Sequence, residues 1–406
     1  MKFIEILITI FFLIICIFLK FFNIFFKIKF GTSDFARIGG IYVLDWYISE
    51  KKANNNKSLD IFFYTDKNKQ TNKQWLKMWK KNVFLLNVPH IIIRSIIRVK
   101  KFKFINNIID NIPVNLKYPD LSNFFKTKSK SLIKNHNHRL KCVLNNKQTN
   151  ISFTTEEIQK GKEFLDKIGI HNNKYICINN RDNKYLYTRF KNYDWKYHDY
   201  RNFKIDDYEE TVNFLIDKGF FVIRLGSEAE GHLNIDSKKY FDYSLSEYQS
   251  DFLDIYLSSQ CYFFISSDSG ISAIPEIFRI PVVYINKTFL NEIHRWNIKS
   301  LFIFKKFYSK KYERFLNFEE VWKLKFGDFD HDKNMDTNQI SIQNNSPKEI
   351  KKVSEEMLNF LEKNFQYSEH DELIQNKFWD IFAPNNLRSN FCRIGRDYLY
   401  KNKSLL

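Results

Sequence analysis

Short apolar runs alternate with amphipathic helical patterns through the second half of the chain, and this alternation constrains the fold more than any other feature. A run that is apolar at every position indicates a strand buried on both faces, which is typical of a parallel sheet covered by helices. The runs expected to form strands are 175–179, 220–225, 261–266 and 281–286, with helices expected at about 206–219, 247–259 and 270–278. The pattern predicts an α/β fold with a doubly wound parallel sheet.

Two of the helices in this half carry start and stop signals. Thr154 and Glu157 have the spacing of a capping box, and Gly169 follows the apolar stripe of that helix. Asp206 and Glu209 have the spacing of a second helix start, and Gly219 is the expected end of that helix. Both segments are therefore expected to be helices that lead into a strand.

The first half shows the same rhythm less clearly. Helices are expected at about 40–50, 73–81 and 90–100, and strands at 61–65 and 83–87. With 406 residues the chain is long enough for two α/β domains of roughly 150 residues each. The polar stretch 136–150 is the expected link. The expected division is an anchor at 1–30, domains at 31–150 and 151–326, and a polar insertion with C-terminal helices at 327–406.

The N-terminus carries a long apolar stretch. No charged residue occurs from Ile6 to Leu19, and if Lys20 is tolerated the stretch extends from Phe3 to Phe26. That is close to the roughly 20 residues needed to span a bilayer. More lysines follow the stretch than precede it, which favours a cytoplasmic C-terminal body. We therefore expect a single-pass anchor.

Two alternatives to an anchor remain. A cleaved signal peptide is disfavoured because no small-x-small site directly follows the apolar run. An interfacial helix is the other alternative, because Glu5 and Lys20 lie within the run.

The overall charge favours an anionic partner. The chain has 64 Lys and Arg residues against 46 Asp and Glu residues, a formal net charge of +18. The lysines are spread along the chain rather than gathered in one stripe, so we expect a membrane surface as a partner and no nucleic acid. The five cysteines include no C-x-x-C pair, which predicts buried thiols rather than disulfides or a zinc site.

The residues that follow the expected strands are the candidates for a binding site, because ligands of open parallel sheets bind at the carboxyl ends of the strands. These positions hold two arginines and a Ser/Gly-rich helix start, which suit a diphosphate: guanidinium groups bind phosphate oxygens in pairs, and a helix N-terminus offers free N–H groups. The expected phosphate-binding residues are Arg181, Arg224, Gly226, Ser227, Ser267, Asp268, Ser269 and Gly270.

Each of these positions also has an ordinary structural interpretation. Arg181 and Asp182 would equally form a surface ion pair. The run 266–270 has the composition of a common N-cap turn. Its Asp-Ser-Gly sequence lacks the flanking glycines of a serine-protease nucleophile, so that interpretation is excluded.

The segment 193–202, Y-D-W-K-Y-H-D-Y-R-N, is a long connection rich in aromatic, carboxylate and amide groups. Sugar rings need stacking surfaces and many directed hydrogen bonds, and long connections in α/β domains are often functional. The alternative is that the aromatic side chains pack the segment down as a lid. His198 and Asp199 are its candidate functional residues.

The string R-D…Y-x-x-T-R-F…D-W-K-Y-H-D-Y-R-N…R-L-G-S…F-F-I-S-S-D-S-G resembles a family of bacterial glycosyltransferases linked to surface-polysaccharide synthesis. The resemblance covers about Ile176 to Asn286. Arg37-Ile38-Gly39-Gly40 is similar to an N-terminal element of that family in which His commonly takes the fourth position, where this chain has Gly40. Arg181 and the run 266–270 are also similar to the donor site of the fucosyltransferase superfamily.

The resemblance implies a GT-B-like architecture of two Rossmann-like domains. A nucleotide-sugar donor would bind in domain 151–326, and a glycan or lipid-linked acceptor on the side of domain 31–150. Asp182, His198 or Asp199 would contact the donor sugar or act as general base, with Arg37 and Asp34 across the cleft. It further implies a bacterial inner-membrane location with the catalytic body in the cytoplasm.

No cofactor and no metal are expected, since the nucleotide sugar is a substrate and protein cations would stabilise the leaving diphosphate. A metal-dependent alternative is Asp328-Phe329-Asp330-His331-Asp332, whose D-x-D pattern suits a divalent ion, although no apolar strand precedes it. The pair His136 and His138 lacks a third ligand nearby. A second functional hypothesis is a non-catalytic membrane-bound scaffold or glycan-binding protein that retains the fold.

Overall fold

The computed structural model of the chain describes residues 2–22, 28–32, 38–40, 42–65, 72–99, 141–146, 148–171, 174–189, 191, 194–267, 269–288, 290, 293, 297, 299–324, 339–381 and 392–406. The described residues form two compact units, one up to Glu157 and the other from Ile158 onward.

The N-terminal unit contains a three-stranded parallel sheet. Its strands, in spatial order, are β1 (Ile28–Thr32), β2 (Leu59–Tyr64) and β3 (Phe84–Asn87). The helices of this unit are α1 (Lys2–Phe22), α2 (Tyr42–Ala53), α3 (Lys73–Trp79) and α4 (His90–Val99), with a 3-10 turn η1 at Ile38–Gly40. The expected strands and helices of the first half are therefore confirmed, and β1 is an additional strand.

The predicted single-pass inner-membrane anchor is wrong, and with it the expectation of a cytoplasmic body tethered to a membrane. Within the described ranges, the chain has no helix whose length and apolar character would let it cross a bilayer. Residues 3–22 of the expected span instead form most of α1, which packs against α4. Cys16 of α1 lies in a buried cluster with Phe63, Ile96 and Val99. Glu5 is also buried, 3.1 Å from Arg98.

The C-terminal unit is built on a seven-stranded sheet in which every neighbouring pair is parallel. Its spatial order is β13-β9-β8-β7-β4-β5-β6. The strands are β4 (Tyr175–Ile178), β5 (Phe221–Arg224), β6 (Tyr240–Asp242), β7 (Phe264–Ser266), β8 (Val282–Lys287), β9 (Ser300–Phe304) and β13 (Cys392–Ile394). The prediction of a parallel α/β sheet is confirmed.

The strand order places a topological switch point in the middle of this sheet. The chain starts at β4, adds β5 and β6 on one side, and then returns to place β7, β8, β9 and β13 on the other. Connections therefore leave β4 and β7 in opposite directions. A crevice at the carboxyl ends of such a strand pair is where open α/β sheets bind ligands.

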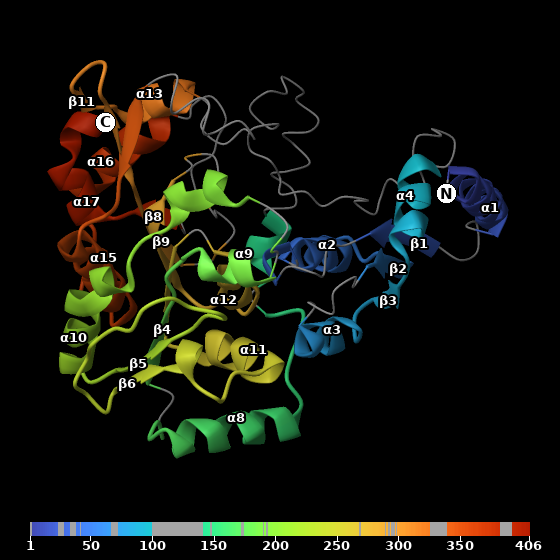
Figure 1. The fold of residues 1–406 in the computed structure, drawn as a ribbon, viewed down its shortest axis with the longest axis horizontal. Coiled ribbons are helices and arrows are strands. Elements are labelled where there is room, and N and C mark those ends of the chain that lie inside the picture. The colour runs from blue at the N-terminus through green and yellow to red at the C-terminus, as the bar shows by residue number, and fades with distance from the viewer. Residues whose placement is uncertain are drawn as a thin grey trace. The chain divides into compact units, whose positions relative to one another are not determined.

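Helices cover both faces of the sheet (Figure 1). On one face α10 (Glu209–Asp217) packs against α15 (Pro347–Leu361), which also contacts β8 and β9; on the other, α11 (Asp251–Gln260) packs against α12 (Ala273–Ile277). The remaining helices are α8 (Thr155–Lys167), α9 (Lys184–Arg189), α13 (Phe318–Lys323), α16 (Glu369–Asp380) and α17 (Arg396–Lys401). The 3-10 turns are η3 (Lys196–Arg201), η4 (Ile205–Tyr208), η5 (Tyr243–Leu245), η6 (Gly270–Ser272) and η8 (Lys403–Leu405).

A second, antiparallel sheet of this unit has the order β11-β10-β12. Its strands are β10 (Lys306–Ser309), β11 (Arg314–Phe315) and β12 (Ile340–Gln343). Because β10 starts two residues after β9 ends, this sheet is a direct continuation of the chain from the carboxyl edge of the parallel sheet.

Of the two predicted helix starts, the one at Thr154 is confirmed and the one at Asp206 is wrong. The capping box before α8 is confirmed, with Thr154 N donating to Glu157 Oε2 (2.8 Å) and Glu157 N donating to Thr154 Oγ1 (3.2 Å). Asp206 is not a helix cap, because it lies in η4 and α10 begins only at Glu209, without a side-chain cap. All five cysteines are buried and free, as predicted.

Candidate functional site

Three strand ends are tied together at the switch point. Asn179, the first residue after β4, donates from Nδ2 to Leu225 O (3.3 Å), directly after β5. Its Oδ1 lies 3.5 Å from Ser266 Oγ, at the end of β7. The buried hydroxyl of Tyr208 donates to Asn179 O (3.0 Å). These bonds tie the carboxyl ends of β4, β5 and β7 together through polar groups.

Ser267, the first residue after β7, contributes a further buried hydroxyl at these strand ends. Its side chain is fully buried, and its Oγ has no hydrogen-bond partner among the described residues. A buried polar atom without a partner costs roughly 1–3 kcal/mol, which makes this hydroxyl a candidate contact for a ligand. The backbone beyond it turns into η6, with Ser269 N donating to Ser267 O (2.7 Å). Ser267, Ser269 and Gly270 thus lie together here, whereas Asp268 lies outside the described residues.

The loop after β4 and the end of the aromatic segment share one hydrogen-bond network. Arg181 Nη1 donates to Asn202 Oδ1 (3.1 Å), and Asn202 Nδ2 donates to Asn183 Oδ1 (2.7 Å). Asn183 Nδ2 then donates to Asp199 Oδ1 (2.6 Å). Two of the predicted site residues, Arg181 and Asp199, are therefore brought together, and Asn183 and Asn202 link them.

The carboxylate of Asp182 accepts hydrogen bonds from the backbone of two different loops. Its Oδ1 accepts from Lys184 N (3.0 Å), at the start of α9, and its Oδ2 accepts from Glu230 N (2.9 Å), in the loop after β5. This carboxylate joins two loops, so its proposed role as a general base stays a prediction.

Arg224 is completely buried, and its terminal nitrogens are engaged by protein acceptors. Nη1 donates to Gly231 O (2.7 Å) and Asp242 Oδ2 (3.0 Å). Nη2 donates to Glu230 O (2.6 Å) and Asn180 Oδ1 (3.1 Å). The guanidinium thereby fastens the loop after β5 to the ends of β4 and β6, instead of presenting these donors to a phosphate.

The structure describes the other predicted residues to different extents. Gly226 and Ser227 lie half-buried in the loop that Arg224 fastens, and a Cβ on Gly226 would stand 3.9 Å from Asn179 Nδ2. His198 lies in η3, but its side chain is outside the described part of the structure, as are Arg37 and Asp34 altogether. Their roles stay predictions.

The aromatic segment has a partly structural role. Trp195 is buried and Tyr200 half-buried, which fits the alternative that the aromatic side chains hold the segment down. Asp199, by contrast, is exposed. The segment therefore packs through its rings and presents a polar edge to Asn183.

Two buried lysines at the same edge of the sheet were not identified from the sequence. Lys287 ends β8 and Lys305 follows β9, each is 2% exposed, and Lys305 N donates to Lys287 O (2.8 Å). Lys305 Nζ donates to Tyr200 O (2.7 Å) and Asn202 O (3.0 Å). Lys287 was detectable, because it comes one residue after the expected strand 281–286. Lys305 was missed along with the strand before it.

An asparagine pair fixes the backbone beside these lysines. Asn286 N donates to Asn345 Oδ1 (2.6 Å), and Asn345 N donates to Asn286 Oδ1 (2.7 Å). Asn345 Nδ2 also donates to Phe304 O (2.7 Å). Asn286 has φ of +51°, a left-handed conformation that Asn adopts more readily than most residues. The pair holds the irregular ends of β8 and β9, and so the positions of the lysines.

The charge of Lys305 affects the pKa of a nearby carboxyl group, that of Asp207. Burial raises the pKa of Asp207, and Asp206 raises it further, while the charges of Lys204 and Lys305 oppose the shift. Positive charge is therefore present at this edge of the sheet.

No metal site is found in the described ranges, where no three His, Cys, Asp or Glu side chains are grouped to hold an ion. The Asp328–Asp332 cluster lies within residues 325–338, outside the described part of the chain. Metal independence stays a prediction.

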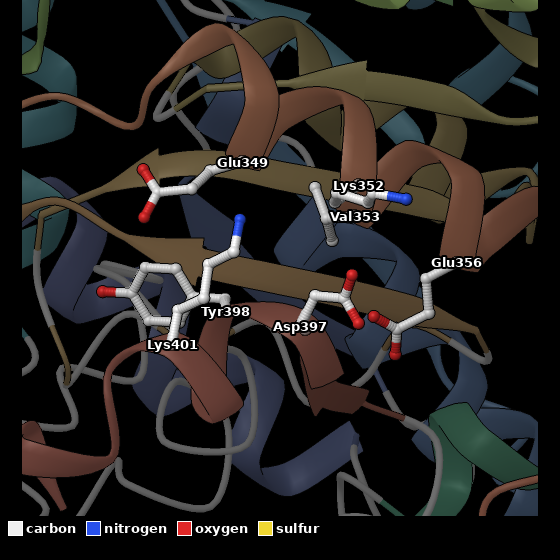
Figure 2. A pocket seen from close by; sticks show the side chains of 8 residues that line it. Glu349, Lys352, Val353, Glu356, Asp397, Tyr398 and Lys401 are labelled. Atoms are coloured by element: carbon white, nitrogen blue, oxygen red, sulfur yellow. The ribbon is translucent and has the colours of Figure 1, made fainter.

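A surface hollow occurs elsewhere, between α15 and α17 (Figure 2). Its lining residues are Glu349, Lys352, Val353, Glu356, Gly395, Asp397, Tyr398 and Lys401. None of the predicted site residues lines it, and its charges are mixed. We therefore place the candidate site at the switch point and not in this hollow.

No protein-family profile matches the chain, and no curated protein matches it. Among solved structures, it is similar to a family 9 glycosyl transferase from Veillonella parvula, with 10% identity, a TM-score of 0.44, and coverage of 82% of this chain and 97% of that one. It is also similar to the E. coli ADP-heptose LPS heptosyltransferase II, with 11% identity, a TM-score of 0.41, and coverage of 83% and 98%.

A third similar structure is a UDP-GlcNAc 2-epimerase from Neisseria meningitidis bound to UDP-GlcNAc, with 13% identity, a TM-score of 0.36, and coverage of 83% of this chain and 100% of that one. Likeness at these values carries no inference about activity, so the function has to be inferred from the residues of the chain itself.

Proposed function

We propose that the chain is a glycosyltransferase that binds a nucleotide-sugar donor at the carboxyl edge of β4 and β7 and transfers the sugar to a glycan or lipid-linked acceptor in bacterial surface-polysaccharide synthesis. The observation that carries the proposal is the buried hydroxyl of Ser267 at the switch point of the parallel sheet, which has no hydrogen-bond partner among the residues that the structure describes. Around it, the same edge of the sheet bears the guanidinium of Arg181 and the buried ammonium groups of Lys287 and Lys305.

This combination suits a diphosphate. A phosphate oxygen accepts a hydrogen bond from a hydroxyl, and a guanidinium that is already oriented by Asn202 loses little freedom when it binds a phosphate oxygen. Buried cations near the leaving group stabilise the charge that develops on the diphosphate during transfer. Chemistry of this kind needs no metal and no cofactor.

Roles for the other residues follow from their contacts. Asp199 is exposed and is held by Asn183, so it is our first candidate to contact the donor sugar or deprotonate the acceptor hydroxyl, with His198 as the second. Arg224 and Asp182 are proposed as positioning residues, because both hold the loop after β5. Arg37 and an acceptor site in the N-terminal unit remain part of the proposal from the sequence resemblance alone, as does the GT-B-like pairing of two Rossmann-like domains.

The proposal is tested by titrating the purified full chain with ADP, GDP, UDP and CDP in a calorimeter, and repeating the titration with Arg181→Ala. Loss of one charge-assisted hydrogen bond, worth roughly 1.5–3 kcal/mol, should raise the Kd of the bound nucleotide about tenfold or more. Arg314→Ala is the matched control, because Arg314 is exposed and pairs with Glu320 beside the antiparallel sheet.

An unchanged Kd in Arg181→Ala would refute the assignment of the donor site. If the wild-type chain binds none of the nucleotides, the scaffold or glycan-binding alternative is favoured, since such a protein has no need for a nucleotide.

A further inference from the structure

Lys305 is a charged side chain placed where packing alone would not require one. It is 2% exposed, and its ammonium group donates to the carbonyl oxygens of Tyr200 (2.7 Å) and Asn202 (3.0 Å). Burying an ammonium group is costly, and the two carbonyl acceptors offset part of that cost, as does the charge of Asp207 nearby. A methionine would fill a similar space without the charge, so the contacts of the ammonium group are the feature to explain.

The two carbonyls belong to the segment that faces the loop after β4. Asn202 N donates to Asp199 O (2.9 Å), which closes η3, and Phe203 N donates to Arg181 O (3.2 Å). The side chain of Asn202 is bonded at both ends, accepting from Arg181 and donating to Asn183. A displacement of this backbone by a fraction of an ångström would therefore move the partner that orients Arg181.

The base of Lys305 is itself fixed. Its backbone N–H is bonded to Lys287 O, and the residue before it, Phe304, is held through its carbonyl by Asn345 Nδ2. These bonds fix the backbone at the carboxyl end of β9. From there the ammonium group of Lys305 contacts a loop more than a hundred residues earlier in the chain.

We infer that Lys305 is a positioning residue of the donor site, which acts through the backbone of Tyr200 and Asn202 to set Asn202 against Arg181. The inference rests on the proposed function, since it assigns Lys305 to the site that binds the nucleotide sugar. Its effect on binding passes through Asn202, and this separates it from a lysine that merely stabilises the fold.

The test is a double-mutant cycle on nucleotide affinity with Lys305→Met and Asn202→Ala in the full chain. The probe is the nucleoside diphosphate that binds the wild type most tightly. Each single change should raise its Kd about tenfold, because each removes the orientation of one charge-assisted contact. The double variant should be no weaker than the weaker single variant, since both changes break the same chain of contacts.

Lys306→Met is the matched control. Lys306 is the next residue and pairs with Glu349 (3.1 Å) outside this network, so its loss should leave the Kd unchanged and combine additively with Asn202→Ala. If Lys305→Met does not fold, Lys305→Gln replaces it in the same cycle, because the shorter neutral amide cannot reach both carbonyls.

Additive effects in the cycle would overturn the inference, and so would a wild-type Kd in the Lys305 variant with only its melting temperature lowered. In both cases the proposed function stands if Arg181→Ala still weakens binding. If the wild-type chain binds no nucleotide at all, the proposed function fails and the inference fails with it.

Discussion

Replacing Ser267 by alanine should stabilise the chain and weaken its donor site at the same time. The hydroxyl is fully buried and has no partner within the described residues, so the ligand-free protein bears the cost of an unsatisfied polar atom. That cost is roughly 1–3 kcal/mol, and removing one oxygen sacrifices only a little packing. We expect Ser267→Ala to raise the free energy of unfolding by about 1 kcal/mol, or the melting temperature by about 2–4 °C.

Ser266→Ala, one residue earlier, should lower the free energy of unfolding instead of raising it. Ser266 is equally buried, but its Oγ lies 3.0 Å from Ser267 O and 3.5 Å from Asn179 Oδ1, so its removal leaves acceptors unsatisfied. We expect this variant to lose about 1 kcal/mol. Both variants are compared by urea unfolding of the full chain without nucleotide.

Nucleotide binding completes the comparison. If Ser267 Oγ donates to a phosphate, Ser267→Ala should raise the Kd of the diphosphate nucleotide about tenfold while the free protein becomes more stable. Destabilisation of Ser267→Ala to the same extent as Ser266→Ala would refute the claim that the hydroxyl is unsatisfied. A stabilised variant with unchanged affinity would refute its role as a ligand.

Two further predictions concern buried carboxyl groups with shifted pKa values. Burial raises the pKa of Glu356 to about 7, although Tyr367 Oη and Arg396 N both donate to its carboxylate. The folded chain holds this proton where the unfolded chain has released it, so stability should fall from pH 5 to pH 7, and Glu356→Gln should flatten that fall by up to about 3 kcal/mol. The pKa of Glu157 is shifted in the opposite direction. Burial raises this pKa, but hydrogen bonds from Lys77, the Thr154 backbone and Gln74 outweigh burial and lower the pKa to about 2. Its stabilisation is present above pH 4.5 and should be lost as the pH falls toward 2, with Glu157→Gln weakening that acid sensitivity by about 1–3 kcal/mol in urea unfolding.

Neighbouring carboxylates provide controls for both. Glu355→Gln changes a partly exposed residue paired with Lys352, and Glu156→Gln changes an exposed one, so neither should alter the pH dependence by more than a few tenths of a kcal/mol. An unaltered slope in Glu356→Gln or Glu157→Gln would contradict the corresponding prediction.

The alternation of apolar strands and amphipathic helices was sufficient to predict a parallel α/β sheet, because strands buried on both faces leave continuous apolar runs. It did not reveal every strand of that sheet. β6 and β13 have only three residues each, and β13 carries Arg393 in its middle, so neither has a readable pattern, while the five-residue apolar strand β9 was missed. The strand order and the position of the switch point depend on how these elements assemble, which periodicity does not encode.

The N-terminal helix shows how a local pattern misleads. α1 is apolar on both faces: one face packs against α4 and Phe63 of β2, and the other carries exposed apolar side chains, among them Phe3, Phe11 and Phe18. The signal against a membrane span was Glu5, whose carboxylate approaches Arg98 of α4. That pairing joins residues far apart in the sequence, so the sequence pattern of α1 alone did not reveal it.

The candidate site was predictable in part, because the ends of parallel strands can be located from the apolar runs. Arg181, Asp199 and Ser267 lie directly after strands or in a distinctive loop, and their places at the edge follow from sheet topology. Arg224 occupies an equally suitable position, but Glu230 and Gly231 fold back over it and engage its guanidinium. Which contacts each arginine makes depends on the path of the loops around it, and that path is not a property of the motif.

The most direct test of the central claim is a thermal-shift screen of the full chain against nucleoside diphosphates and their sugar derivatives, with and without EDTA. A donor at one hundred times its Kd adds about 2.7 kcal/mol of stability, which should raise the melting temperature by roughly 5–10 °C. We predict such a shift for one base, unchanged by EDTA and strongly reduced in Arg181→Ala. A panel without any shift would contradict the claim that this edge of the sheet binds a nucleotide sugar, and a shift abolished by EDTA would contradict a metal-free site.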